Sequence, residues 1–278
     1  MSISEDAILG LVQGLSEFLP ISSSGHLALL EYFFGIEGES ALTFAVMLHA
    51  GTLISVFAVY FRDIAALFYE LAMVVKDLFT GKGPGINANP TRKLGFLIIT
   101  ATIPTAIIAM LFKDAFEAMY RMLFVIGAGF LITGTILVIA ERIGANRNTT
   151  AKMKFRSAFF VGICQGIAIC PGISRSGTTI FGSLVCGLTR GEAVKFAFLI
   201  SIPAILGSAA LEAPNAFKAG MDAAMAAPVL IGMAVAAVSG FIAIKTMIKV
   251  VSNKKLFGFS VYTWGLGIFV LVYSFFLS

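Results

Sequence analysis

The sequence predicts an all-α polytopic membrane protein, with two inverted-topology repeats inside a single integral membrane domain of residues 1–278. Of the 278 residues, 58% are hydrophobic and 13% charged, whereas soluble domains carry about 25% charged residues. Six apolar segments reach the roughly 20 residues that cross a bilayer. Two further apolar stretches are each interrupted by a serine-rich motif, and the two motifs lie 152 positions apart.

The first half of the chain begins with an apolar stretch at about 4–35 that is broken at "LPISSSGH". Proline and glycine stop a helix there, and serines supply hydrogen bonds to the freed backbone groups. Non-helical backbone at membrane depth is tolerated only where protein buries it or where it lines a cavity. We therefore expect a re-entrant helical hairpin, followed by spans at about 41–61, 94–112 and 120–140. The segment from Ile64 to Phe79 is either a seventh span or a helix at the membrane surface.

The second half repeats this order. A stretch at about 157–188 is broken at "CPGISRSGT" and predicts a second re-entrant hairpin. Spans are expected at about 190–211, 227–248 and 259–277.

Lysine and arginine predict the orientation of the spans. Most basic residues fall on one side, within 62–93, 142–156, 190–195 and 245–255, and only Lys113, Arg121 and Lys218 fall on the other. Basic loops are typical of the cytoplasmic face. We therefore expect a multi-pass protein of the plasma (inner) membrane with both termini outside, the first hairpin entering from outside and the second from the cytoplasm.

The two halves carry matching motifs. Gln13-Gly14 corresponds to Gln165-Gly166, and the segment 21–25, "ISSSG", to the segment 173–177, "ISRSG", at the same offset of 152 positions. Each half is a hairpin followed by three spans, and an odd number of spans inverts the second copy. The predicted repeats, 1–141 and 153–278, follow the inverted-repeat plan of transporters.

Several protein classes are not indicated. The net charge of +5 follows from basic cytoplasmic loops, so no nucleic-acid partner is expected. Cys164, Cys170 and Cys186 have neither metal-binding nor redox spacing. The first residues, "MSISEDAILG", hold no basic region typical of a cleaved signal peptide. No Walker A loop, zinc motif or dinucleotide fingerprint occurs.

The first broken stretch combines a carboxylate, hydroxyls and an imidazole. Gln13 and Glu17 are four residues apart on one helix and share a face, which points toward Ser22, Ser23, Ser24 and His26. These are the groups of nucleophilic or acid–base catalysis. The alternative is structural: the serines cap the second half-helix and His26 lies in its first turn.

The second broken stretch supplies the opposite charge. Arg175 lies among Ser174, Ser176, Thr178 and Thr179 at the start of a helix. A helix N-terminus favours anions, and the guanidinium fork suits phosphate oxygens. Arg175 has either Glu17 or an anionic substrate as its partner. His49 is interpreted as a packing residue outside the site.

At these motifs the sequence resembles the undecaprenyl-pyrophosphate phosphatase family associated with bacitracin resistance. "QGLSE" (13–17) runs into "FLPISSSGH" (18–26) and meets the first family motif, and "PGISRSGTT" (171–179) meets the second. The resemblance covers essentially the whole chain. Some members have two acidic residues where this chain has Gln13 and Glu17, and some have arginine after a tyrosine in the last span, where this chain has Tyr262-Thr263.

The resemblance implies an enzyme that hydrolyses polyprenyl diphosphate to the monophosphate, recycling the lipid carrier of cell-envelope glycan synthesis and conferring bacitracin resistance. It implies Glu17, His26 and Arg175 as essential and a divalent metal ion, Mg²⁺ or Ca²⁺, near Gln13 and Glu17. We expect Ser23 as nucleophile with His26 as acid–base, or His26 itself as nucleophile; direct attack by water is the third alternative. The implied phosphate-binding residues are Ser22, Ser24, Ser174, Ser176, Thr178 and Thr179.

The expected partners are the polyprenyl diphosphate lipid and membrane lipids. Monomer and homodimer both remain open. The rival function is a polyprenyl-phosphate flippase or anion transporter, because inverted repeats are the usual framework for alternating access.

Overall fold

The protein is helical throughout the part of the chain that the structure, a computed structural model, describes: residues 3–35, 39–144, 147–218 and 223–277. Within these residues there are twelve α-helices and one 3₁₀ turn, η1. In chain order they are α1 Ile3–Phe18, α2 Ser23–Phe34, α3 Glu39–Val59, α4 Phe61–Phe79, α5 Pro90–Leu111, α6 Lys113–Tyr120, α7 Leu123–Arg142, η1 Thr150–Lys152, α8 Phe155–Ile167, α9 Arg175–Val185, α10 Arg190–Lys218, α11 Ala223–Ser252 and α12 Phe257–Leu277. This confirms the all-α class.

The predicted spans correspond to long apolar helices. Five helices, α5, α7, α10, α11 and α12, are each long and apolar enough to cross a membrane. The sixth predicted span, 41–61, corresponds to α3, which passes the same test together with α4, although the two helices are bent by 89° at Tyr60. The chain is thus a multi-pass membrane protein.

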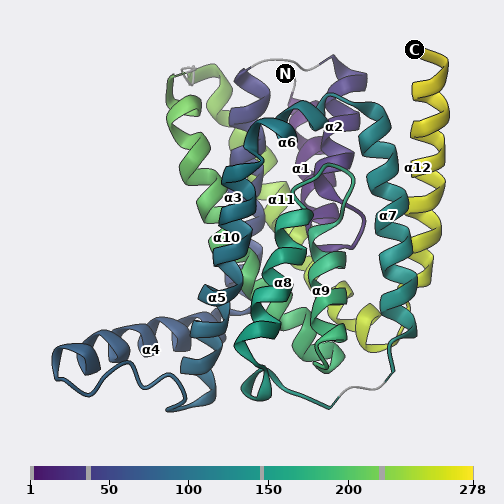
Figure 1. Cartoon of the computed structure of the whole chain (residues 1–278). Coiled ribbons are helices and arrows are strands. Elements are labelled where there is room, and N and C mark those ends of the chain that lie inside the picture. Colours follow the sequence, from purple (N-terminus) through teal and green to yellow (C-terminus); the bar gives the residue numbers. More distant parts are fainter. Residues whose placement is uncertain (1–2, 36–38, 145–146, 219–222, 278) are drawn as a thin grey trace.

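Both interrupted stretches form helical hairpins. The predicted hairpin 4–35 is α1 and α2, and the predicted hairpin 157–188 is α8 and α9. In Figure 1, α1 and α2 occupy the upper half of the bundle, while α8 and α9 occupy the lower half. Both chain ends lie at the top. The two hairpins therefore meet near the middle of the molecule, which places the two serine-rich motifs together.

The position of helix α4 bears on the alternative left open for the segment 64–79. The helix leaves the bundle nearly at a right angle to α3 and projects to one side (Figure 1). Phe68, Leu71 and Phe79 on it are exposed, while its carboxylates pair with the bundle: Asp63 with Lys195 at 2.5 Å and Glu70 with Arg92 at 2.8 Å. An amphipathic helix with this geometry is typical of the membrane interface rather than of a span.

Arg92 secures α4 to the first turn of α5. Its guanidinium is 7% exposed and contacts Asp77 as well as Glu70, each at 2.8 Å. The hydrogen bond from Arg92 holds the pKa of Glu70 below its ordinary value. A carboxylate with a lowered pKa stabilises the folded state above its unfolded pKa, and that contribution is lost as the pH falls through the lowered pKa.

We predict that Arg92→Ala increases amide hydrogen exchange over residues 61–79, because two carboxylates lose their partner. In the wild type the same segment should lose protection only as the pH falls below about 4, the ordinary range of a glutamate. Hydrogen-exchange mass spectrometry, corrected for intrinsic pH effects, measures both. Lys113→Ala, which removes an exposed pair with Glu117 on α6, is the control, and equal exchange in the two variants would contradict the prediction.

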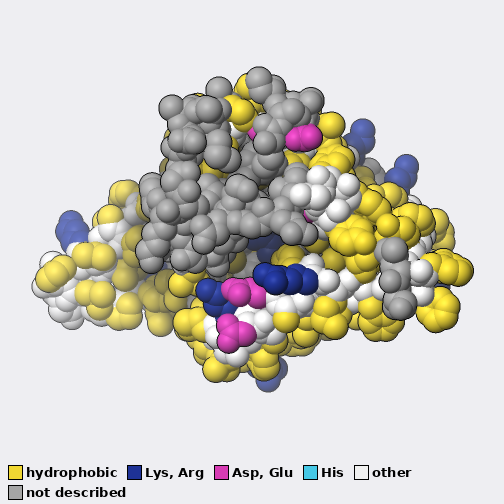
Figure 2. All heavy atoms as spheres, turned by 90° about the horizontal axis from the view of Figure 1, so that it is seen from above, with side chains coloured by type: hydrophobic (Ala, Val, Ile, Leu, Met, Phe, Trp, Pro, Cys, Tyr) yellow, Lys and Arg dark blue, Asp and Glu magenta, His cyan; other side chains and the backbone are white. Residues whose placement is uncertain are grey.

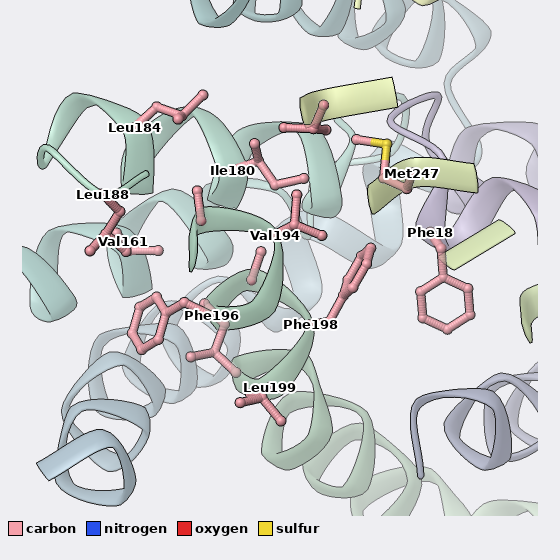
Figure 3. Close-up of a cluster of buried hydrophobic side chains, with 14 of the residues drawn as sticks. Phe18, Val161, Ile180, Leu184, Leu188, Val194, Phe196, Phe198, Leu199 and Met247 are labelled. Atoms are coloured by element: carbon pink, nitrogen blue, oxygen red, sulfur yellow. The ribbon is translucent and has the colours of Figure 1, made fainter. Parts of the chain in front are cut away.

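The largest hydrophobic cluster lies directly beside the first hairpin. Figure 3 shows Phe18 next to Phe198 and Met247, and the rings of Phe18 and Phe198 meet edge to face at 5.4 Å. Phe18 is 1% exposed, and it follows Glu17 in the sequence. The end of α1 is therefore fixed by packing against α10 and α11 on the side away from the hairpin turn.

Charged side chains gather at the end of the bundle that carries both termini. Figure 2 shows that face, with lysine or arginine and acidic side chains close together and hydrophobic side chains around much of the edge. Helix α6 contributes the pair Lys113–Glu117, whose side chains are 48% and 62% exposed. This distribution fits a polar end surrounded by a lipid-facing rim.

Candidate active site at the meeting of two hairpins

The turns of the two hairpins end in the same serine cap, although their backbones differ: φ is 68° at Ser22 and −74° at Ser174. Ser22 caps α2 by accepting from Gly25 N at 3.3 Å, and Ser174 caps α9 by accepting from Gly177 N at 3.2 Å. In each turn the capping hydroxyl also lies 3.2 Å from the serine two residues later, Ser24 or Ser176. The structural role predicted for the serines of the first break is thus confirmed for Ser22. Ser174, which was expected to bind phosphate, has the same capping role, because each serine satisfies a free N–H of a first helical turn.

The backbones of the two turns are in direct contact. A side chain at Gly25 would collide with the backbone of Gly172, which itself adopts a positive φ of 86°. Ser176 Oγ donates to Leu19 O at 3.2 Å, from the second hairpin to the first. Glycine is needed where backbones approach this closely. The close approach places the end of α1 opposite the start of α9.

Glu17 and Arg175 form the centre of the site. Their side chains make an ion pair between Arg175 Nη2 and Glu17 Oε1. The other carboxylate oxygen, Oε2, accepts from Ser23 Oγ at 2.6 Å and from Gln13 Nε2 at 3.0 Å. The Glu17 side chain is 2% exposed and that of Arg175 21%. A carboxylate so deeply buried requires these partners, because an uncompensated charge in a protein interior is costly.

His49, interpreted from the sequence as a packing residue outside the site, lies close to this group. Its Nε2 lies 3.9 Å from Glu17 Oε2, and its side chain is 32% exposed. The rule that ionisable groups at membrane depth are usually functional applies to His49 as well as to His26. Of the two histidines in the chain, His49 is the one whose side chain lies within ion-pair distance of Glu17.

His26 is engaged elsewhere in the same turn. Its Nδ1 lies 2.7 Å from Ser22 O, and its Nε2 lies 2.7 Å from the hydroxyl of Tyr262 on α12. The edge of Phe130 packs against the imidazole at 5.2 Å. The hydroxyl of Ser23 is hydrogen-bonded to Glu17, not to His26. Tyr262 lies 236 positions away in the sequence; the family resemblance pointed to this position but implied no role for the tyrosine itself.

Most of the hydroxyls expected to bind phosphate are bonded within the protein. Thr178 Oγ1 donates to Ser174 O and Thr179 Oγ1 to Arg175 O, both at 2.7 Å. Ser176 Oγ donates to Leu19 O. Both threonines are buried. The threonine hydroxyls stabilise the first turn of α9, and the Ser176 hydroxyl joins it to the first hairpin. Arg175 is the charged group of this motif that reaches the other hairpin.

An open groove lies beside His26. It is bounded by Ile21 of the first turn and by Gly258, Phe259 and Tyr262 of α12, with a volume of about 430 Å³. Tyr262, which lines this groove, also contacts Nε2 of His26, so the groove lies one residue away from the imidazole. An apolar groove that reaches a polar site is suited to a ligand with a hydrocarbon chain and a polar head.

Comparison with known proteins gives a family match over nearly the whole chain. The family of bacitracin resistance protein BacA matches residues 6–269. A protein of Alkaliphilus metalliredigens named undecaprenyl-diphosphatase is 44% identical over 274 residues, 99% of each chain. A protein of the same name from Carboxydothermus hydrogenoformans is 43% identical, over 98% of this chain and 97% of the relative. Another, from Methanosphaera stadtmanae, is 38% identical over 99% of each chain. The chain therefore belongs to the bacitracin resistance protein BacA family.

Proposed function

We propose that this chain is an integral membrane phosphatase that hydrolyses undecaprenyl diphosphate, or a similar polyprenyl diphosphate, to the monophosphate and phosphate. This activity would recycle the lipid carrier of cell-envelope glycan synthesis and confer resistance to bacitracin. The observation that carries the proposal is the Glu17–Arg175 pair, which joins the two hairpin turns with the Ser23 hydroxyl bonded to the same carboxylate. The relatives named above are diphosphatases by name, so the flippase or transporter alternative has no support from them.

In the proposed reaction, the terminal phosphoryl group of the diphosphate binds at Arg175. The guanidinium neutralises charge that develops on the phosphoryl oxygens, which is the main task in phosphoryl transfer. When the anionic substrate takes up hydrogen bonds of Arg175, Glu17 becomes free to receive a proton. In the absence of substrate, Arg175 is thus paired with Glu17, and the substrate replaces Glu17 as the partner of the guanidinium.

Ser23 is the proposed nucleophile. Its Oγ donates to Glu17 at 2.6 Å, the geometry of a nucleophile and its base. The oxygen attacks the terminal phosphorus, the proton passes to Glu17, and the bond to the bridging oxygen breaks to leave polyprenyl monophosphate. Water then attacks the phosphoserine, the bond between phosphorus and the serine oxygen breaks to release phosphate, and Glu17 returns the proton to Ser23. His26, the other nucleophile considered, would form a phosphohistidine, and rapid-quench trapping with labelled substrate distinguishes the two.

A divalent ion fits the donors around Glu17. Gln13 Oε1 is buried and accepts no hydrogen bond within the described structure, and it lies on the amide whose nitrogen contacts Glu17. No group of three or more His, Cys, Asp or Glu residues suited to a metal occurs in the described residues. Mg²⁺ is commonly bound through one or two carboxylates together with substrate phosphates and water. Glu17 and Gln13 Oε1 would hold such an ion, which would supply charge neutralisation.

We further propose that the chain consists of two inverted repeats. Each hairpin packs on a long span of the other half: α1 on α11 and α8 on α5. Gly14 lies against α11 at Ala236, and its counterpart Gly166 lies against α5 at Ile108. The capping bonds at Ser22 and Ser174 also correspond. Combined with the basic loops at the end opposite the termini, this arrangement supports a plasma-membrane protein with both termini outside.

A phosphate-release assay tests the proposed function. We expect detergent-solubilised protein to release phosphate from farnesyl or longer diphosphates in Mg²⁺ or Ca²⁺, and to release none from the corresponding monophosphates. EDTA should suppress the activity and added metal should restore it. Absence of release from any prenyl diphosphate, with either metal, would contradict the phosphatase. Full activity in EDTA would contradict the metal site but not the phosphatase function.

A further inference from the structure

The imidazole of His26 is held at both nitrogens. Nδ1 lies 2.7 Å from a backbone carbonyl, Ser22 O, which can only accept a hydrogen bond. Nδ1 must therefore carry the proton, and in the neutral ring Nε2 is the acceptor. The contact of 2.7 Å between Nε2 and Tyr262 is then a bond that the phenol donates. Geometry alone assigns the tautomer.

Tyr262 is placed rigidly enough to hold this bond. The carboxylate of Glu141, at the end of α7, accepts from the backbone N–H groups of Leu256 and Phe257, the latter at 2.7 Å, and so anchors the start of α12. Trp264 Nε1 donates to Leu131 O at 3.1 Å. These contacts fix α12 to α7 on both sides of Tyr262. The imidazole and phenol rings are nearly parallel, 10° apart, with their centroids 5.7 Å from each other.

The same tyrosine borders the groove. Its ring lies with Ile21 and Phe259 around the space of about 430 Å³, and 47% of the residue is exposed. Nε2 is the nitrogen of His26 that is bonded to a side chain of the groove wall. A residue in this place can direct the reactive nitrogen without itself reacting.

We propose that Tyr262 is a positioning residue of the phosphatase reaction, which holds His26 as the Nδ1–H tautomer by donating a hydrogen bond to Nε2. The proposal rests on the phosphatase function given above. If Nε2 takes up a proton, the bond reverses: the imidazolium N–H donates and the phenol oxygen accepts. Tyr262 therefore supports the ring in both protonation states, whereas phenylalanine supports neither.

Tyr262→Phe tests the role in catalysis. The variant keeps the ring that lines the groove and loses one hydrogen bond, so kcat should fall roughly 2- to 12-fold, the equivalent of one such bond, with little change in KM. Tyr273→Phe, on the same helix beside Phe33, is the matched control and should keep the wild-type kcat. An unchanged kcat in Tyr262→Phe, or a loss confined to KM, would overturn the proposal.

Nitrogen-15 NMR of histidine-labelled protein gives a readout that a merely structural role would not move. The chain has two histidines, and His49→Gln assigns them. At a pH where the ring is neutral, we expect His26 with a protonated Nδ1 and a hydrogen-bonded, unprotonated Nε2. In Tyr262→Phe the Nε2 resonance should shift while His49 stays unchanged. A protonated Nε2 in the neutral ring of the wild type, or identical His26 resonances in both proteins, would refute the hydrogen bond between Tyr262 and His26. This outcome does not depend on whether the wild type releases phosphate.

Discussion

Glu17→Gln is expected to abolish phosphate release, with a loss on the order of 10³-fold or more in kcat, the scale of removing a group that interacts directly with the reacting atoms. The amide has nearly the shape of the carboxylate but cannot accept the proton of Ser23, which is bonded to Glu17 at 2.6 Å. It also leaves the guanidinium of Arg175 without its counter-charge. The measurement is phosphate release from farnesyl diphosphate by the purified variant.

Two further variants separate chemistry from folding. Glu31→Gln removes a carboxylate from α2 of the same hairpin, away from Arg175, and should leave the rate within about twofold, the range of a substitution outside the site. Glu17→Asp keeps the charge but shortens the reach, so its rate should lie between those of wild type and Glu17→Gln. Wild-type activity in Glu17→Gln would exclude Glu17 as the base. Equal losses in Glu31→Gln and Glu17→Gln would attribute the effect to the hairpin rather than to the site.

Much of the fold could be predicted because the bilayer imposes strong constraints on sequence. The six spans required about 20 apolar residues each, and prolines and serines marked both hairpin turns. Helix α4 was ambiguous for a physical reason. Its length and composition suit a span, and only its bend of 89° from α3, together with the pairing of Glu70 and Asp77 to Arg92, distinguishes a surface helix.

The site was predicted in part. The pairing of Glu17 with Arg175 was one of two alternatives that the charges allowed, and the ion pair is present. Sequence spacing could not predict the direction in which each side chain points. His26 and Ser23 are three residues apart, yet Ser23 turns toward Glu17 and His26 toward Tyr262. Contacts such as His49–Glu17 depend on how α3 packs beside α1, which no local pattern encodes.

Arg175→Lys is the second substitution for which a large effect is expected. Lysine keeps the positive charge but presents a single ammonium group instead of a planar fork, and the two side chains are not equivalent where phosphate is recognised. We expect kcat to fall about 10²- to 10³-fold, the range observed when one donor to a developing oxyanion is removed, together with a rise in KM. Phosphate-release kinetics on purified protein measure both.

The controls for Arg175 use another arginine and a small molecule. Arg92→Lys alters an arginine of the α4–α5 contact and should leave the rate near that of wild type. Arg175→Ala should regain part of its activity when guanidinium ion is added, because the guanidinium can enter beside Glu17. Wild-type kinetics in Arg175→Lys would show that charge alone is sufficient, and failure of rescue with an intact fold would weaken the assignment of the guanidinium to the phosphoryl group.

The double variant Glu17→Gln/Arg175→Lys tests whether the two hairpins act as one unit. The rate losses from substituting residues that work together are not additive: once one residue is lost, removal of the other slows the reaction little further. The ion pair and the shared phosphoryl group make this the expected result, so the double variant should be no slower than the slower single variant, within about threefold. Fully multiplicative losses would mean that Glu17 and Arg175 act independently, and that the contact between them in the resting protein has no counterpart in the reaction.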